Sequence, residues 1–133
     1  TALSIEYAPT GKYDAIGGLY WTKGDCGQPM IYGNPKEMPK DFKPQIPIPD
    51  TVQPCNGLGM GFTLFKISMF KKMKERGVTS FFKSVQEYQH GVGVKMMTQD
   101  LFFFANAGRE GFSFASDNRV KVGHMDINDG TVW

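Results

Sequence analysis

The sequence has few cysteines, no long apolar run and almost no charge excess, and each of these absences excludes a class of protein. Its two cysteines, Cys26 and Cys55, cannot form a disulfide framework, and neither belongs to a CxxC pair. We therefore expect both thiols to be reduced. No apolar run approaches the roughly 20 residues that span a bilayer, and no signal-peptide pattern is visible. These absences predict a cytoplasmic protein without a transmembrane segment.

The balance of charge argues against a nucleic-acid partner. Fifteen basic residues face thirteen acidic ones, which gives a net charge of +2. This excess is too small to predict nucleic-acid binding by itself. The longest basic cluster lies within residues 71–76, among apolar residues with helical spacing. It predicts a solvated helix face, with a phosphate or membrane-surface contact as the alternative.

The chain has the composition of a folded domain. Hydrophobic residues make up 41% and charged residues 21% of its 133 residues, which is typical of a globular protein rather than a disordered one. The length fits one domain. The chain begins at Thr1, and residues 1–7 resemble the end of an element that began earlier. We therefore expect residues 1–133 to form a single domain that is a fragment of a longer one.

Hydrophobic spacing predicts a mixed α/β protein. Seven of the eight prolines lie within residues 29–54, so residues 23–54 are expected to be a long loop packed over a surface. Residues 86–97 are expected to be irregular. The expected helices and strands follow from periodicity, caps and turn glycines. The strands are 14–22, 62–65, 80–85, 112–117 and 119–125, and the helices are 67–76, which ends at Gly77, and 98–110, which begins after the cap Thr98. This order favours a mixed sheet covered by two main helices.

Glycine is concentrated at two places in the expected sheet. Gly17 and Gly18 interrupt a strand, which is typical of a bulge or of a close approach by another chain segment. Gly59, Met60 and Gly61 end a glycine-rich run that begins at Asn56, but its spacing does not match a phosphate-binding loop. That run predicts either a tight backbone passage into a strand or a segment whose missing side chains let a substrate approach the main chain.

Asp100 is the first candidate for catalysis. It follows Gln99 at the start of the second expected helix, where an acidic residue stabilises the helix dipole by about 0.3–1 kcal/mol. The same position fixes a carboxylate rigidly at the rim of a sheet, where a general base could meet a substrate hydroxyl. Both interpretations remain open from the helix alone.

His124 is the candidate metal ligand. It shares a strand face with Val120 and Val122, and Asp126 and Asp129 follow it. Imidazole with nearby carboxylates suits a divalent ion such as Mn²⁺. The alternative is a histidine satisfied inside the core.

Aromatic residues border the long loop. Tyr20, Trp21 and Tyr32 could stack on the apolar faces of sugar rings, because aromatic side chains offer flat apolar surfaces. The alternative is that these rings hold the loop against the body of the domain.

The chain contains, in this order, YDAIGGLYW, a proline-rich stretch, NGLGMGFTLFKISMFKKM and MTQDLFFFANAGREGFSFASDNRVKVGHMD. Together these segments resemble the C-terminal, acceptor-side half of inverting family 2 glycosyltransferases, closest to the bacterial and phage-type group with the A-type fold. The resemblance covers residues 11–126, and its most specific stretch is 98–126. It implies a partial nucleotide-diphospho-sugar transferase fold.

The resemblance also implies roles for single residues. Asp100 matches the second position of the family's Glu-Asp or Gln-Asp motif, the general base, and Gln99 matches the first position, which helps to bind the acceptor. His124 matches a histidine that completes the coordination of Mn²⁺ or Mg²⁺ in metal-dependent relatives. The segment 59–61 matches the strand entry near the donor sugar and the acceptor. Trp21 and Tyr32 are added as substrate-binding residues from their aromatic character.

One part of the family pattern is missing. The Asp-x-Asp motif that holds the metal and the diphosphate would lie before residue 1, as would the units that bind the nucleotide. The resemblance therefore implies a parent enzyme that transfers a sugar from a nucleotide-diphosphate donor to an acceptor hydroxyl with inversion, and a chain that is inactive alone. Two alternatives remain: a non-catalytic carbohydrate- or protein-binding module, and a metal-dependent hydrolase built on His124, Asp126 and Asp129.

Overall fold

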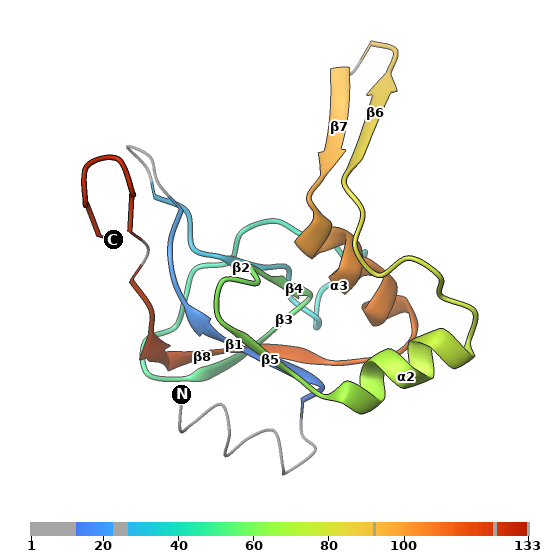
Figure 1. The fold of residues 1–133 in the computed structure, drawn as a ribbon, viewed down its shortest axis with the longest axis horizontal. Helices are drawn as coiled ribbons and strands as arrows, with labels where there is room; N and C mark the ends of the chain where they lie inside the picture. The colour runs from blue at the N-terminus through green and yellow to red at the C-terminus, as the bar shows by residue number, and fades with distance from the viewer. Residues whose placement is uncertain (1–12, 23–26, 92, 124, 133) are drawn as a thin grey trace.

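The structure, a computed structural model, describes residues 13–22, 27–91, 93–123 and 125–132. In these ranges the chain forms short strands and two helices (Figure 1). In chain order they are β1 (Ala15–Leu19), β2 (Ile31–Tyr32), β3 (Val52–Cys55), β4 (Gly57–Leu58), β5 (Thr63–Phe65), α2 (Ile67–Glu75), β6 (Val85–Gln89), β7 (Gly93–Met97), α3 (Gln99–Arg109) and β8 (Phe114–Lys121). The expectation of an α/β protein is confirmed.

The main sheet has four strands in the order β3-β8-β1-β5. β1 pairs in parallel with β8, whereas β5 pairs antiparallel with β1 and β3 pairs antiparallel with β8. The sheet is therefore mixed, as the sequence predicted. The register shifts between Gly18 and Leu19, and a Cβ on Gly18 would lie 2.9 Å from side-chain atoms of Phe62 and Val122. The paired glycines thus mark both a bulge and a close approach.

An aromatic cluster joins the two helices to the sheet. Phe103 and Phe104 of α3 are fully buried, and Phe103 contacts Phe65 of β5 edge-to-face, with ring centroids 5.5 Å apart. Phe70 of α2 stacks on Phe103 at 5.3 Å. Such pairs contribute beyond the area they bury. In Figure 1, α2 continues from the end of β5 and α3 lies over one side of the sheet.

Both helices begin and end where local signals predicted. The hydroxyl of Thr98 accepts a hydrogen bond from the backbone N–H of Leu101 at 3.4 Å, so Thr98 is the N-cap of α3. Gly77 follows α2 with a φ of 89°, a conformation that favours glycine. None of the helices in the described ranges has the length and apolar character needed to cross a bilayer.

The expected strand at 80–85 and the irregular segment 86–97 are wrong. Residues 85–97 instead form a hairpin, in which β6 pairs antiparallel with β7 from Val85↔Met97 to Gln89↔Gly93. Gly91 has a φ of 81° in the turn. The glycines of this segment suggested a loop, but they occupy the turn and the first residue of β7. The hairpin extends away from the sheet at the start of α3 (Figure 1).

Two other boundaries differ from expectation. The long loop 23–54 contains β2 and β3, and the two strands expected at 112–117 and 119–125 are one continuous strand, β8. The two expected strands were separated at Asn118. Instead, the side chains of Asp117 and Asn118 are buried: Asp117 accepts from Arg119 Nε at 2.9 Å, and Asn118 Nδ2 donates to the Ile48 carbonyl at 2.9 Å. Because their polar atoms are satisfied, the strand continues.

Candidate functional site

The segment 59–61 is held from two sides by polar side chains. The carboxylate of Asp100, through Oδ2, accepts a hydrogen bond from the backbone N–H of Met60 at 3.0 Å. The phenol oxygen of Tyr20 accepts one from the next amide, that of Gly61, at 2.8 Å. Tyr20 follows β1 and Asp100 opens α3, so two distant segments converge on two consecutive amides. This convergence defines the candidate site.

Asp100 owes its position to the start of α3. The Thr98 cap fixes the first turn, and Asp100 is the acidic residue of that turn, where the positive end of the helix dipole favours a carboxylate. Its bond to Met60 spans 40 residues of sequence. Oδ1 has no hydrogen-bond partner among the described residues. A carboxylate held at one oxygen, with the other available, is oriented for further contact.

The glycines of segment 59–61 make room for Tyr20. A Cβ on Gly59 would overlap the Tyr20 hydroxyl and would lie 2.6 Å from Met30 Cε. A Cβ on Gly61 would lie 2.8 Å from Tyr20 Cζ. These approaches account for both glycines by packing alone, which favours the tight backbone passage. Contact of the segment with a donor or acceptor stays a prediction.

The charge of the Asp100 carboxylate acts on the phenols of both Tyr20 and Tyr32. Burial raises the pKa of the Tyr20 phenol; the hydrogen bond from Gly61 partly offsets this, and the Asp100 charge adds to it. Burial also raises the pKa of Tyr32, and the Tyr20 and Asp100 charges raise it further. Tyr32 donates to the sulfur of Met30 at 3.2 Å. The site therefore joins one carboxylate to two phenols that stay protonated at neutral pH.

Trp21 and Gln99 flank this site on the surface. Trp21 follows Tyr20 and forms an isolated β-bridge with Pro29, while 38% of its surface stays exposed. Gln99 is the exposed first residue of α3. Sequence reasoning selected Trp21 and Tyr32 but did not assign Tyr20 to the site. Its aromatic character at the border of the long loop was the available signal, because the bond to Gly61 depends on the folded sheet.

The predicted metal ligand His124 lies outside the described residues, so its distance from Asp100 stays untested. The two carboxylates that follow it both stabilise a turn. Asp126 accepts from the amide of Asn128 and Asp129 from the amide of Thr131, each at 2.8 Å. The bonds from Thr131 lower the pKa of Asp129. Within the described part of the chain, no group of three or more His, Cys, Asp or Glu side chains is placed to hold a metal ion.

The two cysteines can be followed only in part. Cys55 is a free, buried thiol in β3, as the sequence predicted. Cys26 lies outside the described residues, so the expectation of two reduced thiols is tested at one position.

Comparison with known proteins supports the fold. No family model matches the sequence, and no curated protein matches it. Among solved structures, the chain is similar to A197 from STIV, with a TM-score of 0.57 and 20% sequence identity. The match covers 94% of this chain and 50% of A197, so the chain spans about half the length of that protein. At this identity the likeness concerns the fold alone.

Proposed function

We propose that this chain is the acceptor-side part of an A-type glycosyltransferase, in which Asp100 is the general base. The observation that carries the proposal is the bond between Asp100 Oδ2 and the Met60 amide, because it fixes a carboxylate beside a glycine-bounded segment and two phenols. The proposal also rests on the resemblance of residues 11–126 to inverting family 2 glycosyltransferases. The complete enzyme would take a nucleotide-diphosphate sugar as donor.

The proposed step is a direct displacement with inversion. Asp100 Oδ1 accepts the proton of an acceptor hydroxyl while that oxygen attacks the anomeric carbon of the donor sugar. The bond from the anomeric carbon to the diphosphate breaks, and the diphosphate leaves with the electron pair. The Met60 amide holds Oδ2 and so aims Oδ1. A base positioned in this way contributes on the order of 10²–10⁴ in rate.

The proposed cofactor is Mn²⁺ or Mg²⁺, which would stabilise the charge of the diphosphate leaving group when bound. The described residues do not offer a ligand group for such an ion. The steps assigned to Asp100 and Met60 therefore do not involve the ion. His124 keeps its proposed role as one ligand of an ion held mainly by other groups.

The test is Asp100→Asn in the complete enzyme, with transfer measured as product formed from a panel of nucleotide-sugar donors. The amide oxygen of Asn can still accept from Met60 but cannot take a proton at neutral pH. We expect kcat to fall on the order of 10²–10⁴ while the donor KM stays within a few fold. The matched control is Asp41→Asn, which alters a carboxylate that accepts from the amide of Lys43 on another segment. It should leave kcat unchanged.

A non-catalytic carbohydrate-binding module is the second candidate, and one observation favours it. The Asp100 carboxylate already has a structural partner in Met60, and the exposed Trp21 could stack on a sugar ring. Under this alternative, Asp100→Asn would leave any transfer activity of the parent within a few fold. Sugar binding to the isolated chain would then weaken on Trp21→Ala, which calorimetry would detect.

A further inference from the structure

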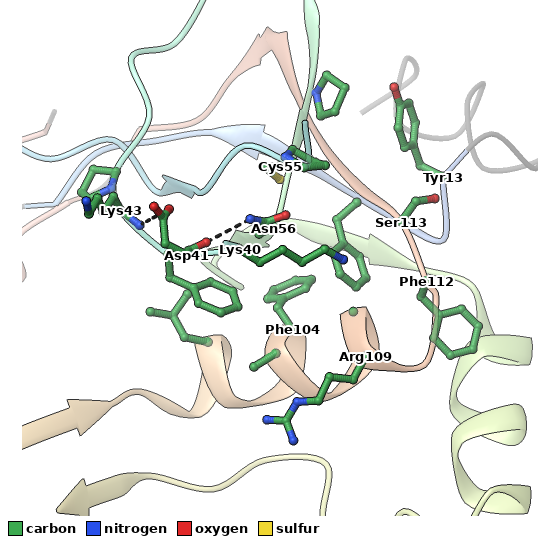
Figure 2. A pocket seen from close by; sticks show the side chains of 18 residues that line it. Tyr13, Lys40, Asp41, Lys43, Cys55, Asn56, Phe104, Arg109, Phe112 and Ser113 are labelled. Atoms are coloured by element: carbon green, nitrogen blue, oxygen red, sulfur yellow. Dashed lines mark hydrogen bonds between the residues drawn. The ribbon is translucent and has the colours of Figure 1, made fainter. Parts of the chain in front are cut away.

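A large cavity lies along one face of α3. Its volume is about 1010 Å³, and it is bordered by the loop around residues 35–44, the ends of β3 and β8, and α3, with one side open to solvent (Figure 2). Ligand pockets commonly measure about 300–1,000 Å³, so the cavity has room for a small molecule. The walls include neither Asp100 nor segment 59–61, so the cavity is separate from the candidate site.

The walls of the cavity are apolar. α3 contributes Leu101, Phe104, Ala105 and Gly108, which share one face of the helix. A Cβ on Gly108 would meet only a ring atom of Phe114, at 3.9 Å, so no neighbour fills the space above it. The adjacent thiol of Cys55 is also buried, and burial raises its pKa well above the ordinary value. It is therefore neutral and behaves as part of the apolar wall.

The charges at the opening are mainly positive. Lys40, Lys43 and Arg109 line the cavity with a single carboxylate, Asp41. That carboxylate accepts from the backbone N–H of Lys43 at 3.2 Å, and the Asp41 carbonyl accepts from Asn56 Nδ2 at 3.0 Å. In Figure 2 the side chain of Lys40 extends across the opening above Phe104. An ammonium group thus lies beside an apolar chamber.

We propose that this cavity binds an amphiphile with an unbranched apolar chain and a single anionic head, such as a long-chain carboxylate. The chain would lie along α3 and displace water from the half-buried side chains of Leu101, Ala105 and Phe112, which favours binding because apolar surface leaves water. The head would pair with Lys40. This inference goes beyond sugar transfer and does not depend on it.

The experiment is calorimetric titration of the 133-residue chain with three probes of equal chain length, each below its micelle concentration. The probes are laurate, 1-dodecanol and dodecyltrimethylammonium. We expect one laurate per chain, bound at least about tenfold more tightly than the cationic probe, because the basic side chains of the lining attract an anion and repel a cation. Absence of laurate binding, or equal affinity for the anionic and cationic probes, would overturn the proposal.

Two pairs of variants locate the site. Lys40→Gln should weaken laurate binding about tenfold by loss of a charged partner and leave dodecanol binding unchanged. The control Lys74→Gln, on the exposed surface of α2, should change neither. Gly108→Leu should weaken binding of both probes because its side chain would occupy the space along α3 that the apolar chain needs, whereas Gly108→Ala should weaken it much less. Wild-type laurate affinity in a folded Gly108→Leu variant contradicts the site. If that variant does not fold, Lys40→Gln and Lys74→Gln test the site. Equal laurate affinities of these two variants contradict the proposed site.

Discussion

The first turn of α3 and the long face of the same helix differ in how they meet the rest of the chain. At the first turn, Asp100 and the nearby Tyr20 hold two consecutive amides with directional hydrogen bonds. Along the face that includes Leu101 and Phe104, the helix borders a chamber of about 1010 Å³. One region is fixed by polar bonds of defined geometry, and the other is defined by apolar walls around open space.

This difference shows that two parts of one helix offer different physical environments. Hydrogen-bonded groups hold their neighbours at fixed distances, which suits a positioned base. Apolar walls attract in proportion to buried area and without direction, which suits a flexible chain. Substitutions that act on one region and leave the other unchanged test whether the two are independent.

The largest stability effect is expected for Phe104→Ala. Phe104 is fully buried, belongs to the core and also lines the chamber. Loss of a buried Phe side chain costs about 3–5 kcal/mol, although the open chamber should place the loss at the lower end of this range. Urea denaturation measures the free energy of unfolding. The control Phe82→Ala removes a ring that is 49% exposed and stacks on Phe103, and it should cost less. Equal losses would contradict the larger contribution expected of the fully buried ring.

Gly59→Ala should damage the polar region specifically. The new Cβ would overlap the Tyr20 hydroxyl, which itself holds the Gly61 amide. Overpacking of this kind costs about 1–3 kcal/mol. We expect a lower free energy of unfolding together with unchanged laurate affinity, because the chamber does not include residue 59. A parallel loss of laurate binding would mean that the two regions are coupled.

Gly108→Ala should raise the free energy of unfolding, whereas Gly59→Ala lowers it. No neighbour would be crowded, because the nearest atom to the added Cβ is a Phe114 ring carbon at 3.9 Å. Alanine is favoured over glycine within a helix by up to about 1 kcal/mol, and the position near the end of α3 should reduce this. The free energy of unfolding should therefore rise by roughly half of that value. A decrease would contradict the open space described above Gly108.

The tyrosine pair should change how stability depends on pH, and this effect appears only in alkaline solution. The pKa values of Tyr20 and Tyr32 are raised above the ordinary 10.0. As pH rises past 10.0, the unfolded chain loses these protons while the folded chain keeps them, so stability is complete below that pH and falls above it. The Tyr20→Phe/Tyr32→Phe double variant should show a shallower decline of the thermal midpoint between pH 9 and 11. An unchanged slope would exclude these two phenols as its source.

Short-range signals in the sequence determined the helices of this protein. The cap at Thr98 and the glycine at position 77 act within one helical turn, so α2 and α3 could be predicted nearly to their ends. The same holds for the strand bulge at Gly17 and Gly18. The sequence also selected Asp100 and segment 59–61 as separate candidates, and the structure brings them into contact.

Apolar periodicity predicted a shared face of α3 without showing what it contacts. Helical spacing places Leu101, Phe104, Ala105 and Gly108 on one face, which borders the cavity. Of these four only Phe104 is fully buried, and the other buried residues of the helix are Phe103 and Ala107. A repeat of apolar residues shows which side chains share a face; the rest of the fold decides whether that face is filled.

Only the tertiary structure decided the features that depend on distant pairing. The hairpin at 85–97, the single strand β8 and the bond from Tyr20 to Gly61 each require partners that no local pattern specifies. The Tyr20 bond spans 41 residues, and such contacts form only when the entropy of closing the intervening loop is offset by the whole fold. The sequence determined the elements and the chemistry they carry, and the packing of the sheet determined which of them meet.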